Sequence, residues 1–138
     1  MALEIGEHQV EGVTVLALKG RITVGEVTPV REKITHLLAE GRNKIVLDLA
    51  NVDYIDSTGL GNVVISYTQV QRTGGALKLL NLNKRNVELL ALTRLHTIFE
   101  VFAQETDAVN SFFPGREIKH FDILSSVQQH KEEAEAEA

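Results

Sequence analysis

Residues 44–72 of the chain read KIVLDLANVDYIDSTGLGNVVISYTQVQR. The stretch begins with a short apolar run, residues 44–49, of the kind that is buried on both faces of a sheet. A loop is expected over residues 50–56, and over residues 57–72 the apolar side chains recur at the spacing of one helix face. A buried strand followed by an amphipathic helix is the unit from which α/β folds are built.

The alternation of strands and helices continues on both sides of this stretch. The expected elements are, in chain order, strands over residues 3–9 and 13–19, a helix from residue 26 to a C-cap at residue 41, the strand and helix above, a strand over 76–80, a helix over 84–96, a strand over 99–102 and a helix over 106–113. Glu11 and Gly12 form a turn signal, which predicts an antiparallel hairpin. Gly20 is expected to end the second strand, and Thr106 or Asp107 to cap the last helix.

Strands separated by helices of this length favour parallel pairing. The expected fold class is therefore α/β. It comprises a mixed β-sheet with an N-terminal antiparallel hairpin and otherwise mainly parallel strands, with helices packed against it.

The chain has 138 residues and a formal net charge of −5, which is unevenly distributed. Residues 131–138 carry one Lys and four Glu, so this low-complexity tail supplies −3 and the rest of the chain only −2. We expect one domain over residues 1–113, which is enough for a single hydrophobic core. Residues 114–130 form an extension that could cover a sheet edge, mediate self-association or act as a spacer. The tail over 131–138 is expected to be disordered or a frayed helix.

The composition excludes several classes of protein. The chain has no Cys, and therefore no disulfide framework, thiolate nucleophile or zinc finger. No run approaches the roughly 18 apolar residues of a membrane helix, and residues 1–10 lack the pattern of a signal peptide. The scattered basic residues give no footprint for nucleic acid. We therefore expect a cytoplasmic protein that neither inserts into a membrane nor binds nucleic acid.

No motif supports an enzyme, a metal site or a bound cofactor. A P-loop-like spacing of glycines fails because Glu26 stands where the phosphate-binding Lys is required. A dinucleotide fingerprint that begins at Gly59 fails because Val64 replaces its third glycine. The five His show no metal-ligand spacing.

Three aspartates, at positions 48, 53 and 56, leave one alternative from the enzyme class, the magnesium site of a phospho-aspartate receiver. Such a domain needs a pair of acids at the end of its first parallel strand. This chain has Leu18-Lys19-Gly20 there, which disfavours the alternative.

The most informative segment is the junction between loop and helix. Asp56, Ser57 and Thr58 can each cap the helix that follows. Gly59 and Gly61 in the first turn each cost roughly 0.8–1.0 kcal/mol relative to Ala, so we interpret them as leaving the backbone bare for a partner or a phosphate. A helix N-terminus also favours negative charge, and a phosphoryl group on Ser57 would add about −1.5 to −2. The structural alternative is that Ser57 is an N-cap and the glycines serve a tight loop.

Taken with the order of elements, the run Ile55-Asp56-Ser57-Thr58-Gly59-Leu60 resembles the phosphorylation motif of STAS domains, the sulphate transporter and anti-sigma factor antagonist family. The resemblance covers roughly residues 3–113. It includes the hairpin, the strands over residues 13–20, 45–49 and 77–80, and the closing segment 97–102.

The resemblance implies a function as an anti-sigma factor antagonist that acts by partner switching. In such members the motif serine, here Ser57, is phosphorylated by an anti-sigma serine kinase of the histidine-kinase-like ATPase fold. The unphosphorylated domain binds that kinase, phosphorylation breaks the complex, and a serine phosphatase resets it. Thr58 offers a second, less favoured hydroxyl.

The resemblance also implies the partner-binding residues. Asp56, Thr58 and Gly59 would form the rim around Ser57, together with Gly61, and the loop near Thr23 would complete the docking face. Many antagonists carry an acid where this chain has Thr23, which leaves that contact open. The alternative function is an accessory or scaffold STAS subunit of a transporter or signalling complex that is not regulated by phosphorylation. A homodimer is compatible with either function.

Overall fold

The computed structural model describes residues 3–137 and begins with a β-hairpin. β1 (Glu4–Val10) pairs antiparallel with β2 (Val13–Ile22). Both residues of the turn between them are left-handed, Glu11 at φ 50° and Gly12 at φ 84°. Two left-handed residues make a type I′ turn, whose twist matches that of the flanking strands. The predicted N-terminal hairpin is confirmed.

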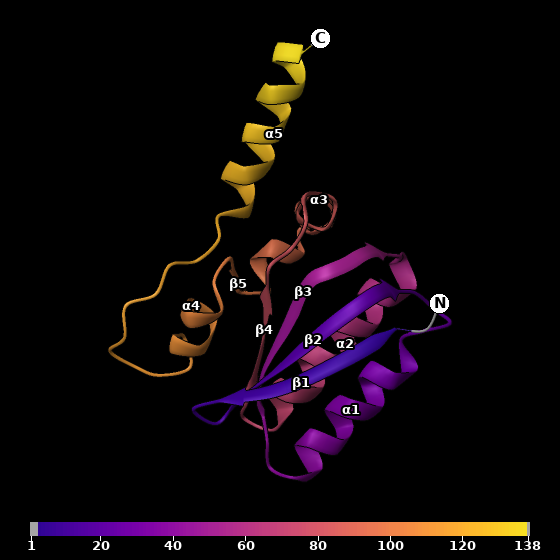
Figure 1. Ribbon diagram of the computed structural model, residues 1–138, viewed down its shortest axis with the longest axis vertical. Coiled ribbons are helices and arrows are strands. Elements are labelled where there is room, and N and C mark those ends of the chain that lie inside the picture. The colour runs from indigo at the N-terminus through magenta and orange to yellow at the C-terminus, as the bar shows by residue number, and fades with distance from the viewer. Residues whose placement is uncertain (1–2, 138) are drawn as a thin grey trace.

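Five strands form one sheet, and their order in space, β1-β2-β3-β4-β5, is their order in the chain. β3 (Lys44–Ile55), β4 (Ala76–Leu80) and β5 (Val101–Phe102) each pair in parallel with the strand before them. Figure 1 shows β1 and β5 on opposite sides of the three central strands. The predicted mixed sheet of the α/β class is confirmed.

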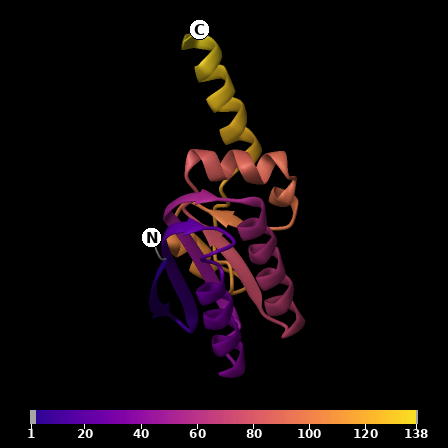
Figure 2. The same ribbon diagram turned by 90° about the vertical axis from the view of Figure 1, so that its right-hand side faces the viewer.

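Helices cover both faces of this sheet. α1 (Thr28–Ala39) and α2 (Ser57–Arg72) lie side by side on one face (Figures 1 and 2). α4 (Glu105–Asn110) packs against the opposite face, where a smaller core forms. The larger core includes Leu16, Ile34, Leu47, Val63, Val70 and Leu79, and the smaller one Val15, Val46, Leu80, Phe102 and Val109. The central strands are apolar on both faces because both are buried.

α3 (Lys84–Leu92) lies across the end of the sheet and is tied to β3 by two asparagines (Figure 2). The side-chain oxygen of Asn83 caps the helix by accepting the N–H of Asn86 at 2.8 Å. Both side-chain amides donate to the carbonyl of Val52, at 3.0 Å from Asn83 and 3.1 Å from Asn86. These bonds fix the first turn of α3 beside the strand that leads to Ser57.

Several strand ends differ from the prediction. The predicted loop over residues 50–56 is the second half of β3, which continues to Ile55. β2 also continues past Gly20, through a register shift between Gly20 and Arg21, and pairs Ile22 with Ile55. The prediction was wrong here because the last part of β2 and the second half of β3 are strands only through their pairing with each other. β5 begins at Val101 rather than at residue 99.

Several helix ends also differ, and α1 begins at Thr28 rather than at residue 26. The predicted helix over residues 84–96 ends at Leu92, because Arg94 takes a left-handed φ of 60°, and a 3-10 turn, η1 (Leu95–Thr97), follows. α4 begins and ends earlier than the predicted 106–113. Its N-cap is Gln104, whose side chain makes no capping bond, so neither Thr106 nor Asp107 caps this helix.

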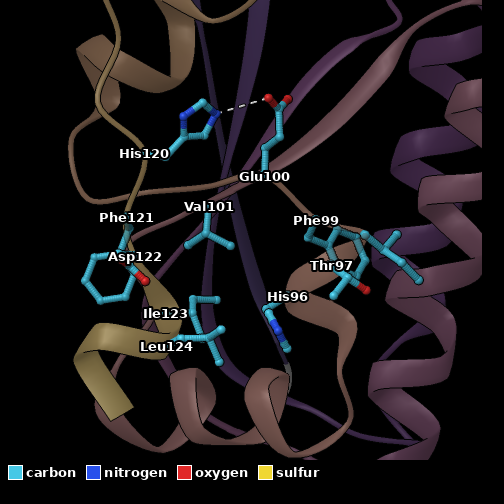
Figure 3. Close-up of a pocket in the computed structure, with 11 residues that line it drawn as sticks. His96, Thr97, Phe99, Glu100, Val101, His120, Phe121, Asp122, Ile123 and Leu124 are labelled. Atoms are coloured by element: carbon cyan, nitrogen blue, oxygen red, sulfur yellow. Dashed lines mark hydrogen bonds and ion pairs between the residues drawn. The ribbon is translucent and has the colours of Figure 1, made fainter. Parts of the chain in front are cut away.

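The C-terminal extension runs along the free edge of β5. The Phe121 N–H donates to the Val101 carbonyl at 2.8 Å, and the His120 ring lies 4.9 Å from the Phe102 ring, centroid to centroid. His120 also contacts the Glu100 carboxylate at 3.2 Å (Figure 3). Between the extension and the η1–β5 segment lies a hollow of about 350 Å³. The extension thus lies beside the edge of β5, and each of the three roles considered for it stays a prediction.

Glu100 joins this extension to the sheet through charge. Its carboxylate lies 2.8 Å from the Nζ of Lys78, a nearly buried lysine on β4, as well as 3.2 Å from His120. Partial burial raises the pKa of Glu100, but the hydrogen bonds from Lys78 and His120 outweigh it, so the pKa lies below the ordinary 4.5. The pairing therefore favours the ionised carboxylate.

The last helix, α5 (Ile123–Glu137), packs on α3 at its start and then projects from the body (Figure 1). Asp122 precedes it and accepts hydrogen bonds from the N–H and hydroxyl of Ser125, at 3.1 and 2.9 Å. Ile123 is buried. Residues 131–137 continue this helix. Within residues 3–137, no helix is both long and apolar enough to cross a membrane.

Candidate functional site

The segment around Ser57 lies where β2 and β3 end together. Ile22 pairs with Ile55, and the Asp56 N–H donates to the Ile22 carbonyl at 3.2 Å. Thr23, which follows β2, and Ser57, which begins the helix after β3, therefore come to the same edge of the sheet. The structure thus brings together two segments that the sequence analysis assigned to one docking face.

Asp56, and not Ser57, is the N-cap of α2. Asp56 has extended backbone angles, φ −87° and ψ 176°, and its carboxylate accepts the Gly59 N–H at 2.6 Å. Ser57 is the first residue of the helix, and its side chain is exposed. Its hydroxyl makes no hydrogen bond to any residue of the range 3–137. The structural alternative that Ser57 serves as the cap is therefore wrong, and its hydroxyl is open to solvent.

The two glycines of the first turn have different roles. Gly59 is buried, and a Cβ there would lie 1.9 Å from the backbone carbonyl oxygen of Ile22. It is required because α2 passes that close to the end of β2, which corrects the interpretation that this glycine leaves the backbone bare for a partner. Gly61 is exposed, and a Cβ there would meet nothing within 4 Å. Only Gly61 leaves its backbone open at the surface.

Two exposed apolar residues, which the sequence analysis did not single out, border the serine. Ile65 is 52% exposed and follows Ser57 and Gly61 at intervals of four residues, so the three share one face of α2. Val24, 68% exposed, lies in the turn in which Thr23 accepts the Glu26 N–H at 3.0 Å. We call Thr23, Val24, Ser57, Thr58, Gly61 and Ile65 the Ser57 face. Ile65 falls outside the apolar stripe of its helix. This position was the sequence signal that could have identified it as an exposed apolar residue.

A groove of about 500 Å³ opens on the other side of Ser57, between the end of β3 and α3. We call it the Arg85 groove; it is lined by Tyr54, Ile55, Asp56, Ser57, Arg85, Glu88, Leu89 and Leu92. The Arg85 guanidinium lies over the Tyr54 ring, 4.4 Å from its centroid. Leu92 is 84% exposed at its rim. Sequence reasoning did not find this groove, because its two walls lie about 30 positions apart in the printed sequence.

The three aspartates considered as a magnesium site are engaged separately. Asp48 accepts the N–H of Ala50 at 3.1 Å, and Asp56 caps α2. Asp53 is exposed on β3. Within residues 3–137, no three His, Asp or Glu side chains are grouped to hold a metal ion.

The comparisons with known proteins agree with this fold. The family model described as the STAS domain matches residues 6–108, and the chain belongs to this family. The anti-sigma-B factor antagonist of Bacillus subtilis is 33% identical over 109 residues, which cover 79% of this chain and 99% of that protein. This relative is named as a regulator and not as an enzyme.

Solved structures show the same fold. The crystal structure of an anti-sigma factor antagonist from Mycobacterium paratuberculosis has a TM-score of 0.70 at 20% identity, covering 79% of this chain and 92% of that one. The Bacillus cell fate determinant SpoIIAA, in its phosphorylated form, has a TM-score of 0.63 at 20% identity, covering 79% of this chain and 99% of that one. At these identities the likeness is one of fold.

Proposed function

We propose that the protein is an anti-sigma factor antagonist that works by partner switching in the cytoplasm. In its unphosphorylated state it binds an anti-sigma serine kinase of the histidine-kinase-like ATPase fold through the Ser57 face. Phosphorylation of Ser57 ends that complex, and a serine phosphatase restores it. The observation that carries the proposal is that Ser57 is exposed at the first position of α2 while Asp56 does the capping.

The composition of the Ser57 face supports binding by the unphosphorylated form. It combines the exposed apolar side chains of Val24 and Ile65 with the small polar residues Ser57 and Thr58. Apolar side chains this exposed are suited to burial against a partner. A bare Gly61 lets a partner approach the helix backbone closely.

The chemistry of Ser57 supports release on phosphorylation. A phosphoryl group adds a charge of about −1.5 to −2 in the middle of this face. In the free protein the helix N-terminus stabilises that charge. In a closed interface the charge would have to lose its water or meet a partner group placed to pair with it. Phosphorylation therefore favours the free state unless the partner supplies a matching cation.

The proposal is tested by incubating the protein with its serine kinase and ATP, and mapping the phosphate by mass spectrometry. We expect phosphate on Ser57, none in Ser57→Ala, and normal modification in Thr58→Ala, the matched control for a neighbouring exposed hydroxyl. In a binding assay, Ser57→Ala should hold the kinase and Ser57→Asp should bind at least about tenfold more weakly, a difference of about 1.4 kcal/mol.

Two results would contradict the proposal. Phosphate found only on Thr58 would move the switch to the other hydroxyl. Equal kinase binding by Ser57→Ala and Ser57→Asp would show that the charge does not control the complex. Co-purification with a transporter or scaffold, without any kinase, would support the accessory-subunit alternative instead.

A further inference from the structure

Two arginines lie near the ring of Tyr54, which precedes Ser57 by three residues. The guanidinium groups of Arg85 and Arg21 lie 4.4 and 6.0 Å from the centroid of the Tyr54 ring. Neither forms an ion pair in the part of the chain that the structure describes. Arg21 pairs in register with Tyr54 across β2 and β3, and Arg85 reaches the ring from α3. Tyr54 thus has two arginines near its ring that form no ion pair within residues 3–137, and one of them, Arg85, lines the same groove as Ser57.

The place of Arg85 in its helix is electrostatically unfavourable. Arg85 and Lys84 occupy the first turn of α3, which holds no acidic residue. The N-terminal end of a helix carries partial positive charge, so cations there are disfavoured and anions favoured. The positive charge of Arg85 does not stabilise α3. The position of the helix is fixed instead by the hydrogen bonds of Asn83 and Asn86 to Val52. Departures from local preference of this kind concentrate at functional sites.

We propose that the Arg85 groove binds the phosphoryl group of Ser57 in the same chain, with Arg85 as the principal ligand. This proposal rests on the proposed function, because it requires phosphate on Ser57. Ser57 and Arg85 line the same groove. A guanidinium presents two parallel N–H donors that match two phosphate oxygens. Arg21, behind Tyr54, adds positive potential at longer range.

Two carboxylates also line the groove and oppose the phosphate. Asp56 is committed to the Gly59 N–H at 2.6 Å. Glu88 lies one turn beyond Arg85 on α3 without pairing with it. Arg85 is therefore the one cationic side chain among the residues that line the Arg85 groove. Its pairing with phosphate would join the start of α2 to α3, so phosphorylation would alter the groove as well as the Ser57 face.

The test uses full-length protein with phosphoserine inserted at position 57 during translation, so no kinase is needed. A phosphorus NMR titration then measures the second pKa of the phosphate, which is about 6 for an unperturbed group. A paired guanidinium favours the dianion and lowers this pKa. We expect Arg85→Gln to raise it by about half a unit, as suits an exposed pair. We expect the difference to shrink in about 1 M salt, where the Debye length is about 3 Å.

Matched variants separate pairing from a general effect of charge. Arg72→Gln removes the same charge at the far end of α2, about 22 Å along the helix axis, and should leave the pKa unchanged. Arg85→Lys keeps the charge without the two-pronged donor and should give an intermediate value. Glu88→Gln removes an opposing charge and should lower the pKa. Arg85 is exposed, so its variants should fold, which circular dichroism checks.

An equal second pKa in the parent and Arg85→Gln proteins would overturn the proposal. If, in addition, Arg85→Gln weakened kinase binding by the unphosphorylated protein, Arg85 would be assigned to the partner interface instead. Because the phosphoserine is introduced without a kinase, this result is independent of whether the kinase modifies Ser57. Failure of the proposed function and failure of the groove are therefore seen in different experiments.

Discussion

The close approach of α2 to the end of β2 gives a prediction that a single methyl group can test. In Gly59→Ala the new Cβ would stand 1.9 Å from the Ile22 carbonyl oxygen and 2.6 Å from the Ile22 carbonyl carbon. Contacts below 3.0 Å are essentially never seen for a real Cβ, so the two backbones would have to separate by about 1.1 Å. Both contacting atoms are backbone, and no side chain can rotate away to relieve the overlap.

The cost of that separation follows from what the carbonyl does. The same Ile22 oxygen accepts the Asp56 N–H at 3.2 Å, so moving it strains the bond that joins the two strand ends. Overpacking a closely packed site costs typically about 1–3 kcal/mol, and here a backbone hydrogen bond worth about 1 kcal/mol is added. We expect Gly59→Ala to lower the free energy of unfolding by about 3 kcal/mol.

Gly61→Ala is the matched control two residues along the same helix. Its Cβ would enter open space, and Ala is preferred to Gly inside a helix by about 0.8–1.0 kcal/mol. We therefore expect Gly61→Ala to stabilise the protein by up to about 1 kcal/mol. The two substitutions add the same atom to the same helix, and their predicted effects have opposite signs.

The assay is urea unfolding followed by circular dichroism, with the midpoint and the slope fitted for each variant. An unchanged slope with a lower midpoint for Gly59→Ala, and a higher midpoint for Gly61→Ala, is the expected pattern. A Gly59→Ala protein as stable as its parent would refute the close approach, and with it the steric requirement for glycine at this position.

Three further outcomes are expected. Asp56→Ala should cost about 1 kcal/mol in thermal unfolding because the α2 cap is lost, whereas Asp56→Asn should retain most of that stability. Ile65→Asp should weaken kinase binding at least tenfold by calorimetry with little effect on folding, while Ile118→Asp, on the extension, should bind normally; equal binding by both would contradict the Ser57 face. The pKa of Glu100 lies below 4.5 in the fold, so its contribution to stability is present above that value and is lost as the pH falls through the lowered pKa. The protection factor of the Phe121 amide, which is its exchange rate relative to the intrinsic rate at the same pH, should therefore fall in acid, and Glu100→Gln should remove that fall.

Locally encoded features were predicted well from the sequence. The bounds of α2 and β4 match because polar caps, apolar periodicity and the glycines at 74 and 75 all act within a few residues. The hairpin was predicted for the same reason, since Glu11 and Gly12 favour a tight turn.

Features that depend on distant partners could not be predicted in this way. The second half of β3 is a strand only because β2 continues beside it to Ile22. The need for Gly59 arises from that same residue, which lies 37 positions earlier in the sequence. The sequence offers three candidate caps for α2, and only the backbone geometry at Asp56 chooses between them. The Arg85 groove likewise exists only when α3 is placed against β3.

The sheet order, in which each strand lies beside the one before it in the chain, has a consequence for biosynthesis. No strand has to be inserted between two that are already paired, so the sheet can grow at one edge as the chain leaves the ribosome. The hairpin of β1 and β2 can form first, β3 can then pair with β2, and α2 completes the Ser57 face at residue 65. Arg85 arrives later with α3, and the extension that covers β5 arrives last. The Ser57 face is thus complete before the extension reaches the edge of the sheet.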